Sequence, residues 1–258
     1  MIYRLINVNG RMVKTLSWAR RRPMNLRNII IAALLIGTPS LIVYILSAED
    51  IESTTKNTPL AQITKAIPGL KAPKADVNQI LKTKRCKGCD LREIDLSDLD
   101  LSGADFRNAD LSGANLANTK LKDAKVSGAK LSDADLTKTD LDGADFIGTD
   151  LKGADLSGAI LLNTSLIEAD LSTATAKGAE FRDADMTGAK LKDANLSGAF
   201  LFGVHLKDAD LTNANLTNAF MRYANMREAN LEGANLKGAD LSFAIMPDGT
   251  SPYGTTDY

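Results

Sequence analysis

The sequence predicts an all-β solenoid, and three features of residues 89–246 support this prediction. An apolar residue recurs at every fifth position from Leu91 to Met246, giving 32 centres that are Leu, Phe or Met except at Val126 and Ala176. Two positions before each centre lies a second fixed site, which is Ala in 24 of the 32 repeats and Thr in four. The remaining positions are mostly Ser, Thr, Lys, Asp, Asn and Gly, which favour turns.

A period of five requires a turn within every repeat. A straight strand alternates its faces with period two, so an odd period would exchange inside and outside at each repeat. The Leu and Ala positions nevertheless stay constant, so we expect both to point inward and the residue between them to point outward, as in Ala109-Asp110-Leu111. A helix is disfavoured because its period is 3.6 and Gly is frequent here. A short repeat with two inward residues builds a solenoid.

The unit Ala109-Asp110-Leu111-Ser112-Gly113 resembles the pentapeptide-repeat family, and the resemblance covers about 60% of the chain. The resemblance implies a right-handed quadrilateral β-helix with four repeats per turn, so that 32 repeats form about eight coils. At about 4.8 Å per coil the rod would be roughly 38 Å long. The Cys-x-x-Cys-Asp-Leu entry and the Met246-Pro247-Asp248-Gly249 exit are similar to those of cyanobacterial members.

Residues 1–28 form a basic arm, and residues 29–46 form an apolar segment. The arm carries seven cations and no acidic residue, and the segment has 18 uncharged residues. As a helix this segment would span about 27 Å, close to the roughly 30 Å of a bilayer core. Because cations precede it and Glu49, Asp50 and Glu52 follow it, the N-terminus is expected in the cytoplasm. We predict a transmembrane signal anchor, with the repeats in the periplasm or a thylakoid lumen.

A cleaved signal peptide is the alternative interpretation of this segment. The apolar run is longer than is usual for a signal peptide, and Leu46-Ser47-Ala48 lacks the small-x-small pattern of a cleavage site. Arg20-Arg21-Arg22 suggests a twin-arginine signal, but Pro23-Met24-Asn25 fits that pattern badly. A buried helix of a soluble protein is disfavoured by the seven preceding cations. Both export interpretations place the solenoid outside the cytoplasm.

A linker, a cap and a tail flank the repeats. Residues 47–74 contain three prolines and no sustained apolar period, which suits an extended tether. Residues 75–88 predict a short capping helix, N-capped by Asp76, that covers the first coil. Its apolar face would hold Val77, Ile80 and Leu81. Residues 247–258 show no amphipathic helix, so the last coil is predicted to be bare and able to form an end-to-end homodimer.

Cys86 and Cys89 form the one cysteine motif of the chain. The repeat register places Cys86 at a centre and Cys89 at an alanine position, so both are expected to point inward beneath the cap. Structural zinc needs four ligands, and no second pair exists. A redox Cys-x-x-Cys would need a thioredoxin-like context, which is missing. We predict a buried structural role and allow a disulfide, because an exported compartment is oxidising.

The sequence predicts no enzyme, no metal site and no cofactor. The single histidine, His205, falls at an outward position between Val204 and Leu206, where a solvated side chain is expected. Asp residues recur at the repeat spacing and do not converge, and a filled solenoid offers no enzyme-like cleft. Glycine falls at corners, as in Ser102-Gly103, and not in a phosphate-binding loop.

Charge divides the chain into two parts. Residues 1–88 hold 15 basic and 4 acidic residues, a net charge of +11, whereas residues 89–258 hold 16 and 28, a net charge of −12. An acidic rod permits a second function, because the resemblance includes DNA mimics that shield gyrase. Lysines interleaved along the 20-residue columns, as in Asp110, Lys130 and Asp150, weaken this interpretation. Export would also separate the rod from cytoplasmic enzymes, so nucleic acid is not the expected partner.

One face of the later coils is apolar where the early coils are polar. The outward residues of this candidate interaction patch are Ile160, Leu162, Phe200, Phe202, Phe220, Tyr223 and Phe243. Residues 20 apart are vertical neighbours, so Phe200 is expected beside Phe220, and Tyr223 beside Phe243. A contiguous aromatic cluster often marks an interaction site. We predict partner binding or self-association here; the alternative is that corner packing or the C-terminal tail covers the cluster.

The predicted function is a non-enzymatic scaffold or adaptor, anchored to a membrane, that presents a β-helical rod for protein–protein interaction on the exported side. The alternative is a DNA-mimic regulator of a nucleic-acid enzyme such as gyrase. A redox protein that uses Cys86 and Cys89 is the weakest hypothesis. The sequence does not identify the protein partner.

Overall fold

The computed structural model describes residues 2–8, 11–17, 29–34, 42–47 and 77–252. The chain separates into two compact units, Met1–Ala72 and Pro73–Tyr258. The predicted linker lies outside the described residues apart from Ser47, as does Asp76, the predicted N-cap.

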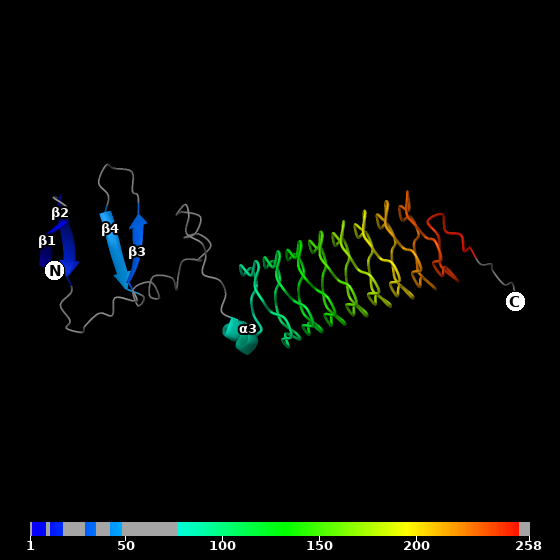
Figure 1. The fold of residues 1–258 in the computed structure, drawn as a ribbon, viewed down its shortest axis with the longest axis horizontal. Helices are drawn as coiled ribbons and strands as arrows, with labels where there is room; N and C mark the ends of the chain where they lie inside the picture. Colours follow the sequence, from blue (N-terminus) through cyan, green and yellow to red (C-terminus); the bar gives the residue numbers. More distant parts are fainter. Residues whose placement is uncertain (1, 9–10, 18–28, 35–41, 48–76, 253–258) are drawn as a thin grey trace. The chain divides into compact units, whose positions relative to one another are not determined.

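The first unit contains two antiparallel strand pairs (Figure 1). They are β1 (Ile2–Val8) with β2 (Arg11–Ser17), and β3 (Ile29–Leu34) with β4 (Ile42–Ser47). Because β3 and β4 lie within the segment predicted as a continuous helix over residues 29–46, the structure does not confirm that helix. Both strands are rich in β-branched Ile and Val, which favour strands over helices. Among the described residues, no helix is long and apolar enough to cross a bilayer.

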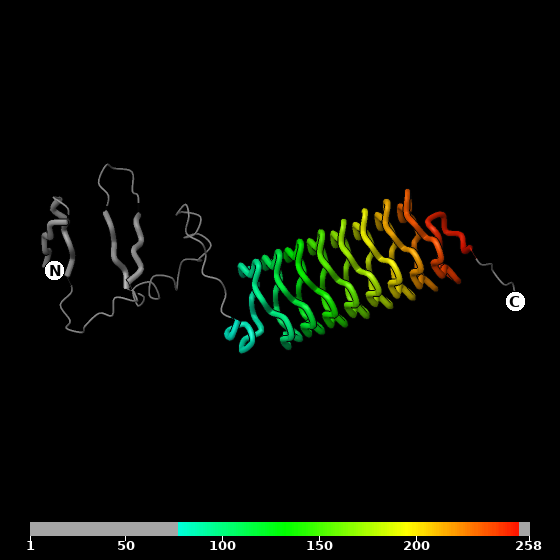
Figure 2. Tube along the Cα trace, in the orientation of Figure 1, coloured from blue at the N-terminus to red at the C-terminus, as the bar shows by residue number. Residues whose placement is uncertain are grey.

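The second unit begins with helix α3 (Val77–Thr83) and continues as a stack of coils. Parallel bridges join residues 20 apart, from the Arg85–Asp105 pair to the Asn225–Ile245 pair. Four repeats therefore make one coil, and the repeats make about eight coils, as the sequence predicts. Figure 2 shows successive coils stacked one on the next.

Backbone hydrogen bonds join each coil to its neighbours on both sides. In a representative repeat, the amide of Leu111 donates to the carbonyl of Lys130 at 2.7 Å. The amide of Lys130 in turn donates to the carbonyl of Ala109 at 2.9 Å. Each interior coil thus satisfies its backbone through the coils before and after it, which is the bonding that a solenoid requires.

Each repeat closes with a β-turn at a corner. The amide of Ala114 donates to the carbonyl of Leu111 at 3.0 Å, and Gly113, third in the turn, has a φ of 64°. A positive φ suits Gly, Asn and Asp, which explains their frequency at this position. The outward Asp110 accepts the amide of Ser112 on its Oδ1 at 3.2 Å. This Asx contact recurs along the rod, so the outward Asp and Asn residues are turn-forming residues.

These carboxylates predict a loss of stability in acid. A hydrogen bond from the Arg107 guanidinium lowers the pKa of Asp105 to about 2, and hydrogen bonds from Ser97 lower the pKa of Asp95. Because the pKa is lower in the folded state, the stabilisation is complete above the unfolded value of about 4 and is lost as the pH falls through the folded value. We expect a melting temperature that is level from pH 7 to 5 and falls below pH 4 in circular dichroism.

The matched control is Asp105→Asn. Its amide oxygen can still accept the backbone amide of Arg107 but does not titrate, so we expect a smaller decline in melting temperature between pH 4 and 2. A melting temperature that stays level or rises below pH 4 in the wild type would contradict the assignment.

The interior of the rod is a filled apolar column. Its largest side chains include Phe106 and Phe146, each no more than 1% exposed. The smaller Val126 falls between them at the 20-residue spacing, and Ala176 precedes Phe181 within a coil. A large side chain thus lies beside a small one in these pairs, which close packing of the column requires.

Four threonines replace alanine at the second inward site and are fully enclosed. They are Thr119, Thr139, Thr149 and Thr164. Each hydroxyl donates to a backbone carbonyl 23 residues earlier; Thr139 Oγ1, for example, lies 2.9 Å from the oxygen of Leu116. Within the described residues, no buried side-chain nitrogen or oxygen lacks a partner. The second inward site therefore accepts a small polar side chain because the coil above supplies an acceptor.

The two ends of the column differ. At the first coil, α3 buries Ile80 to 2% exposure, and Val77 and Leu81 pack against the same core, which confirms the predicted capping helix. At the last coil the four centre residues are only partly buried, whereas every earlier centre from Leu91 onward is at most 2% exposed. These four residues are Leu231, Leu236, Leu241 and Met246. The C-terminal end of the column is therefore lightly covered by the described residues.

Candidate functional site

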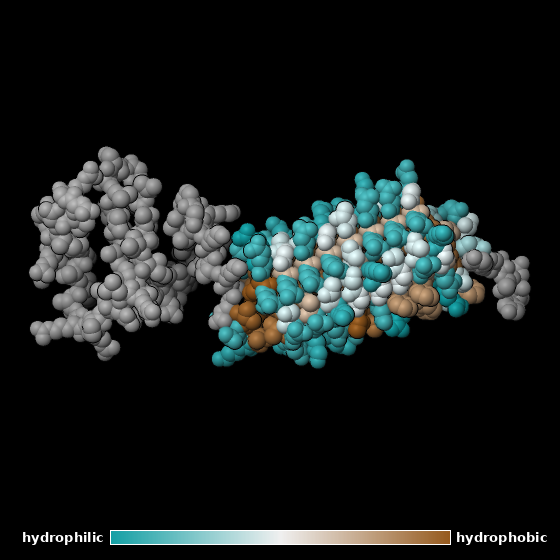
Figure 3. All heavy atoms as spheres, in the orientation of Figure 1, coloured by the Kyte–Doolittle hydropathy of each residue, from teal (hydrophilic) through white to brown (hydrophobic). Residues whose placement is uncertain are grey.

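Five exposed aromatic side chains gather at one corner of the later coils, and we call this cluster the aromatic corner. Its members are Phe200, Phe202, Phe220, Tyr223 and Phe243, each between 39% and 49% exposed. In the view of Figure 3 the rod surface is mostly hydrophilic, and apolar side chains gather along one edge of its later coils. Repeat spacing brings these residues together, as the sequence predicts.

The five rings form two groups, and the rings within each group contact one another. Phe200 and Phe220 occupy bridged positions in adjacent coils, and their rings stack with centroids 4.9 Å apart and planes 5° apart. Tyr223 and Phe243 stack at 5.0 Å and 9°. Phe202 meets Tyr223 edge to face at 5.3 Å and 66°. Stacking between coils therefore fixes the rings of the aromatic corner in place.

The structure separates two predicted patch residues from this cluster. Ile160 is 36% exposed, but Glu180 lies between it and Phe200 in the bridged column. Leu162 is half-buried, and Arg182 lies between it and Phe202 at the 20-residue spacing. The predicted patch is thus a compact aromatic corner plus two isolated aliphatic residues. The sequence analysis did not single out Ile147, which is 43% exposed on another side of the rod.

Two arginines, which the sequence analysis also missed, complete the site. Arg182 and Arg222 line a shallow groove of about 330 Å³ together with Phe200, Phe202 and Phe220. The guanidinium carbon of Arg222 lies 5.9 Å from the ring centroid of Tyr223 and 5.8 Å from that of Phe243. The sequence could have indicated these two arginines, because they lie 20 residues before and 20 residues after Phe202 and therefore in the same column. The groove combines aromatic walls with two guanidinium groups.

Backbone conformation sets Tyr223 and Phe243 apart from most turn residues. Both occupy the third turn position with φ of 59° and 61°, where most other repeats carry Gly, Asn or Asp. For a bulky side chain this left-handed conformation costs on the order of 1 kcal/mol. The aromatic corner therefore exists at the expense of local backbone stability, a pattern typical of functional surfaces.

This strain predicts that Tyr223→Asn/Phe243→Asn changes the free energy of unfolding by less than about 1 kcal/mol, although it removes exposed aromatic packing. Relief of two left-handed aromatic residues, about 1 kcal/mol each, offsets the loss of two ring contacts of about 0.5–1.5 kcal/mol each, the stack of Tyr223 on Phe243 and its edge-to-face contact with Phe202. Urea denaturation followed by circular dichroism measures the difference. A decrease of more than about 1 kcal/mol would show that the rings serve the fold.

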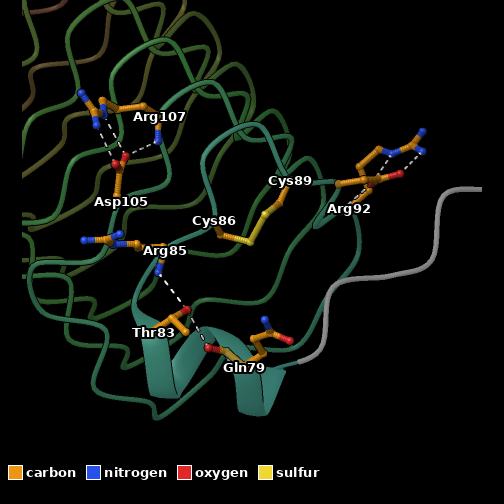
Figure 4. Close-up of a disulfide and its surroundings, with 9 residues drawn as sticks. Gln79, Thr83, Arg85, Cys86, Cys89, Arg92, Asp105 and Arg107 are labelled. Atoms are coloured by element: carbon orange, nitrogen blue, oxygen red, sulfur yellow. Dashed lines mark hydrogen bonds and ion pairs between the residues drawn. A yellow bond between two sulfur atoms is a disulfide. The ribbon is translucent and has the colours of Figure 1, made fainter. Parts of the chain in front are cut away.

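The two cysteines form a disulfide beneath the cap (Figure 4). The Cα atoms of Cys86 and Cys89 are 5.2 Å apart, and Cys86 is 3% exposed. Cys89 is partly buried against the same core. The amide of Cys86 donates to the carbonyl of Asp105 at 2.8 Å, so the bridge lies in the first turn of the coil stack. The disulfide therefore joins the two ends of the first turn of the rod, directly after α3.

Cys86→Ser/Cys89→Ser is expected to lower the free energy of unfolding by about 2 kcal/mol, because the bridge restrains a short loop of the unfolded chain. Reducing agent should lower the melting temperature of the wild type toward that of the variant and leave the variant unchanged. Equal stability with and without the bridge would contradict a structural role.

The described residues contain no cluster of metal-binding side chains. Within the described ranges, no group of three or more His, Cys, Asp and Glu side chains could hold a metal ion. His205 is exposed and lies between Asp185 and Asn225 in its column, at the outward position that the sequence predicts.

The fold is that of a solenoid protein, and the aromatic corner is a distinct apolar surface on a few of its repeats. The family model for pentapeptide repeats matches eight copies in this chain, over residues 89–128, 124–163, 164–203 and 205–243. The chain belongs to the pentapeptide repeat family, whose fold is a right-handed β-helix.

Three solved structures that are similar to this chain are those of HetL, of a thylakoid-lumen protein and of QnrB1. HetL, involved in heterocyst differentiation regulation in Nostoc sp. strain PCC 7120, is 30% identical over 68% of this chain and 97% of its own, with a TM-score of 0.43. A pentapeptide repeat protein from the Arabidopsis thaliana thylakoid lumen is 36% identical over 39% and 70%, with a TM-score of 0.38. QnrB1, a plasmid-mediated fluoroquinolone resistance protein, is 22% identical over 58% and 76%, with a TM-score of 0.35. No curated protein matches the sequence.

Proposed function

We propose that this protein is a non-enzymatic scaffold that binds a protein partner through the aromatic corner. The observation that carries the proposal is two groups of contacting rings, five rings in all and 39–49% exposed, that meet around one groove on a surface that is otherwise mostly polar. Aromatic residues and Arg are enriched at the cores of protein interfaces, and Tyr and Arg are frequent hot spots. The stacked rings are already fixed in the free rod, so binding would lose little side-chain entropy.

The strained turns at Tyr223 and Phe243 support the same proposal. Asn and Gly fill this turn position elsewhere in the rod, so the fold alone does not require an aromatic side chain there. Residues that reduce backbone stability and expose apolar surface are expected where a partner covers them.

The test is the triple variant Phe200→Ser/Phe220→Ser/Tyr223→Ser. We expect it to keep its circular dichroism spectrum while losing self-association or a partner that is captured by the wild type. Its matched control, Asp100→Ser/Lys120→Ser/Asp123→Ser, changes the same positions five coils earlier and should keep binding. A folded triple variant that loses neither activity would refute the proposal.

We also propose that the rod is displayed on the exported side of a membrane, in the periplasm or a thylakoid lumen, and attached through residues 1–46. The support is the seven cations before an uncharged segment of 18 residues, followed by acidic residues. Alkaline phosphatase fused after Tyr258 should be active, because this reporter works only outside the cytoplasm. A fusion that is inactive, paired with a cytoplasmic reporter that is active, would place the rod in the cytoplasm.

The lightly covered C-terminal coil supports an end-to-end homodimer. Its four partly buried centres would be covered by a second copy, and the backbone edge of the last coil could pair with its equivalent. This contact is separate from the aromatic corner, so the triple serine variant should leave it intact. Sedimentation that detects only monomer at high concentration would contradict the dimer.

A DNA-mimic function is the second candidate, favoured by the net charge of −12 over residues 89–258. The turn contacts of the outward carboxylates offer another explanation for this charge, because Asp at these positions forms the corners. Lysines also pair with Asp between coils, as at Lys122 and Asp142, 2.7 Å apart. Inhibition of gyrase supercoiling by the purified protein, retained in the triple serine variant, would favour the DNA mimic.

A further inference from the structure

We infer that the aromatic corner selects a protein segment that carries an apolar side chain beside a carboxylate. The apolar side chain would enter the groove between Phe200 and Phe202, and the carboxylate would bind the guanidinium of Arg222. This inference rests on the proposed function, because it names the chemistry of the partner at the same surface.

The shape of the groove favours a side chain as its occupant. The groove measures about 330 Å³ and is open, lined by three phenylalanines and two arginines. This volume is at the lower limit of sites that hold small molecules, which begin at about 300 Å³. One or two apolar side chains of a peptide would fill it, with the polar backbone of that peptide remaining at the rim.

Ring orientation makes the groove favourable for negative charge. The stack of Phe200 on Phe220 at 4.9 Å covers one face of each ring and leaves the ring edges accessible. Aromatic edges carry partial positive charge, in contrast to the faces. The guanidinium groups of Arg182 and Arg222 add full positive charges beside them. The groove of an acidic rod therefore offers positive charge at its arginines, one of them paired with Glu180 and the other outside any ion pair within residues 77–252.

Arg222 is the guanidinium free to bind a partner carboxylate. Arg182 already forms an ion pair with Glu180 at 2.7 Å. Arg222 lies over the rings of Tyr223 and Phe243, and within residues 77–252 it forms no ion pair. A guanidinium held against aromatic rings keeps its five N–H donors in the plane, where they match a carboxylate.

Neighbouring charges limit how much negative charge the segment can carry. The Asp240 carboxyl is near enough that Arg222 contributes to lowering its pKa, after the larger effect of hydrogen bonds from Ser242. Glu180 and Asp183 lie one coil before Phe200 and Phe202 and two coils before Arg222, and residues 89–258 carry a net charge of −12. A strongly acidic segment would be repelled, so the surface suits one carboxylate next to an apolar side chain.

The test is selection of a random heptapeptide library on the full-length protein, with peptides that also bind the triple serine variant removed. We expect enrichment of Asp or Glu within two positions of Leu, Phe, Met or Trp. For an enriched peptide, Arg222→Gln should raise the Kd about tenfold, the effect of one charge-assisted contact. Arg227→Gln, at the same turn position on the next side of the coil, should change the Kd less than about twofold.

The outcomes separate this inference from the proposed function. Peptides that require the aromatic corner but show no acidic enrichment, or that bind Arg222→Gln as tightly as the wild type, would overturn the carboxylate inference and leave the proposed function standing. A selection in which every bound peptide also binds the triple serine variant, or in which none is enriched, would overturn both.

Discussion

Phe146→Ala is expected to lower the free energy of unfolding by about 3–5 kcal/mol, the usual effect of truncating a buried phenylalanine. Phe146 has no exposed surface and lies in the central column of the rod. Its neighbours at the 20-residue spacing are Val126 and Leu166, which are also buried. Because each coil contacts only the coils beside it, more distant coils cannot move in to fill the cavity. Urea denaturation monitored by circular dichroism provides the measurement.

Phe200→Ala is the matched control for this prediction. The same side chain is removed, but at an outward position where it is 39% exposed. Only part of its surface is buried and one stacking contact is lost, so we expect a decrease of about 1 kcal/mol or less. Equal losses for the two variants would mean that the apolar column is not the main source of stability.

Ala159→Leu is expected to lower the free energy of unfolding by about 2–3 kcal/mol through overpacking. Ala159 is completely buried at the second inward site, beside the filled column. In the two preceding coils of the same column this site holds Thr119 and Thr139, which are also fully buried. The site is therefore occupied by no side chain larger than threonine in these three coils. A leucine would have to displace the side chains or backbone of two neighbouring coils.

Ala159→Thr separates the effect of size from the effect of substitution itself. Thr139 fills the equivalent site one coil earlier and donates its hydroxyl to the carbonyl of Leu116. A threonine at position 159 would find the carbonyl of Leu136 at the same spacing, so we expect a change of less than about 1 kcal/mol. If threonine destabilised the rod as much as leucine, the site would not be the small polar-tolerant position that the structure indicates.

The regular part of the fold could be predicted from the sequence because every repeat obeys the same local rule. The inward positions of residues such as Leu111 and Ala114 follow from the period of five, and both are at most 1% exposed. The family resemblance supplied the coil of four repeats, which the pairing of Arg85 with Asp105 confirms. The cap was predicted from the apolar face that contains Ile80, now shown to be part of the core.

The segment before the repeats was predicted less well. Eighteen uncharged residues satisfy the length criterion for a membrane helix, but length does not distinguish a helix from strands when β-branched residues dominate. The three isoleucines from Ile29 to Ile31 belong to β3 in the structure. Hydropathy measures how apolar a segment is. It does not show whether that segment pairs as a strand, because pairing depends on a second segment of the chain.

The composition of the candidate site was predicted only in part. Period alone brought Phe200 beside Phe220, because residues 20 apart become neighbours in a coil of four repeats. Period could not show that Arg222 lies over two rings, since that depends on side-chain rotamers and a left-handed turn at Tyr223. The period does place Glu180 between Ile160 and Phe200, but the predicted patch was defined by its apolar members alone and so included Ile160.

The central claim is that the aromatic corner is the binding surface of the rod, and photo-crosslinking tests it most directly. A photoreactive amino acid placed at Phe202 should form an adduct with a partner in the native cells, identified by mass spectrometry. The same group at Lys122, four coils earlier in the same column, should form none. The account predicts an adduct at position 202 that disappears in the Phe200→Ser/Phe220→Ser background. Adducts of equal yield at the two positions, or none at position 202, would contradict it.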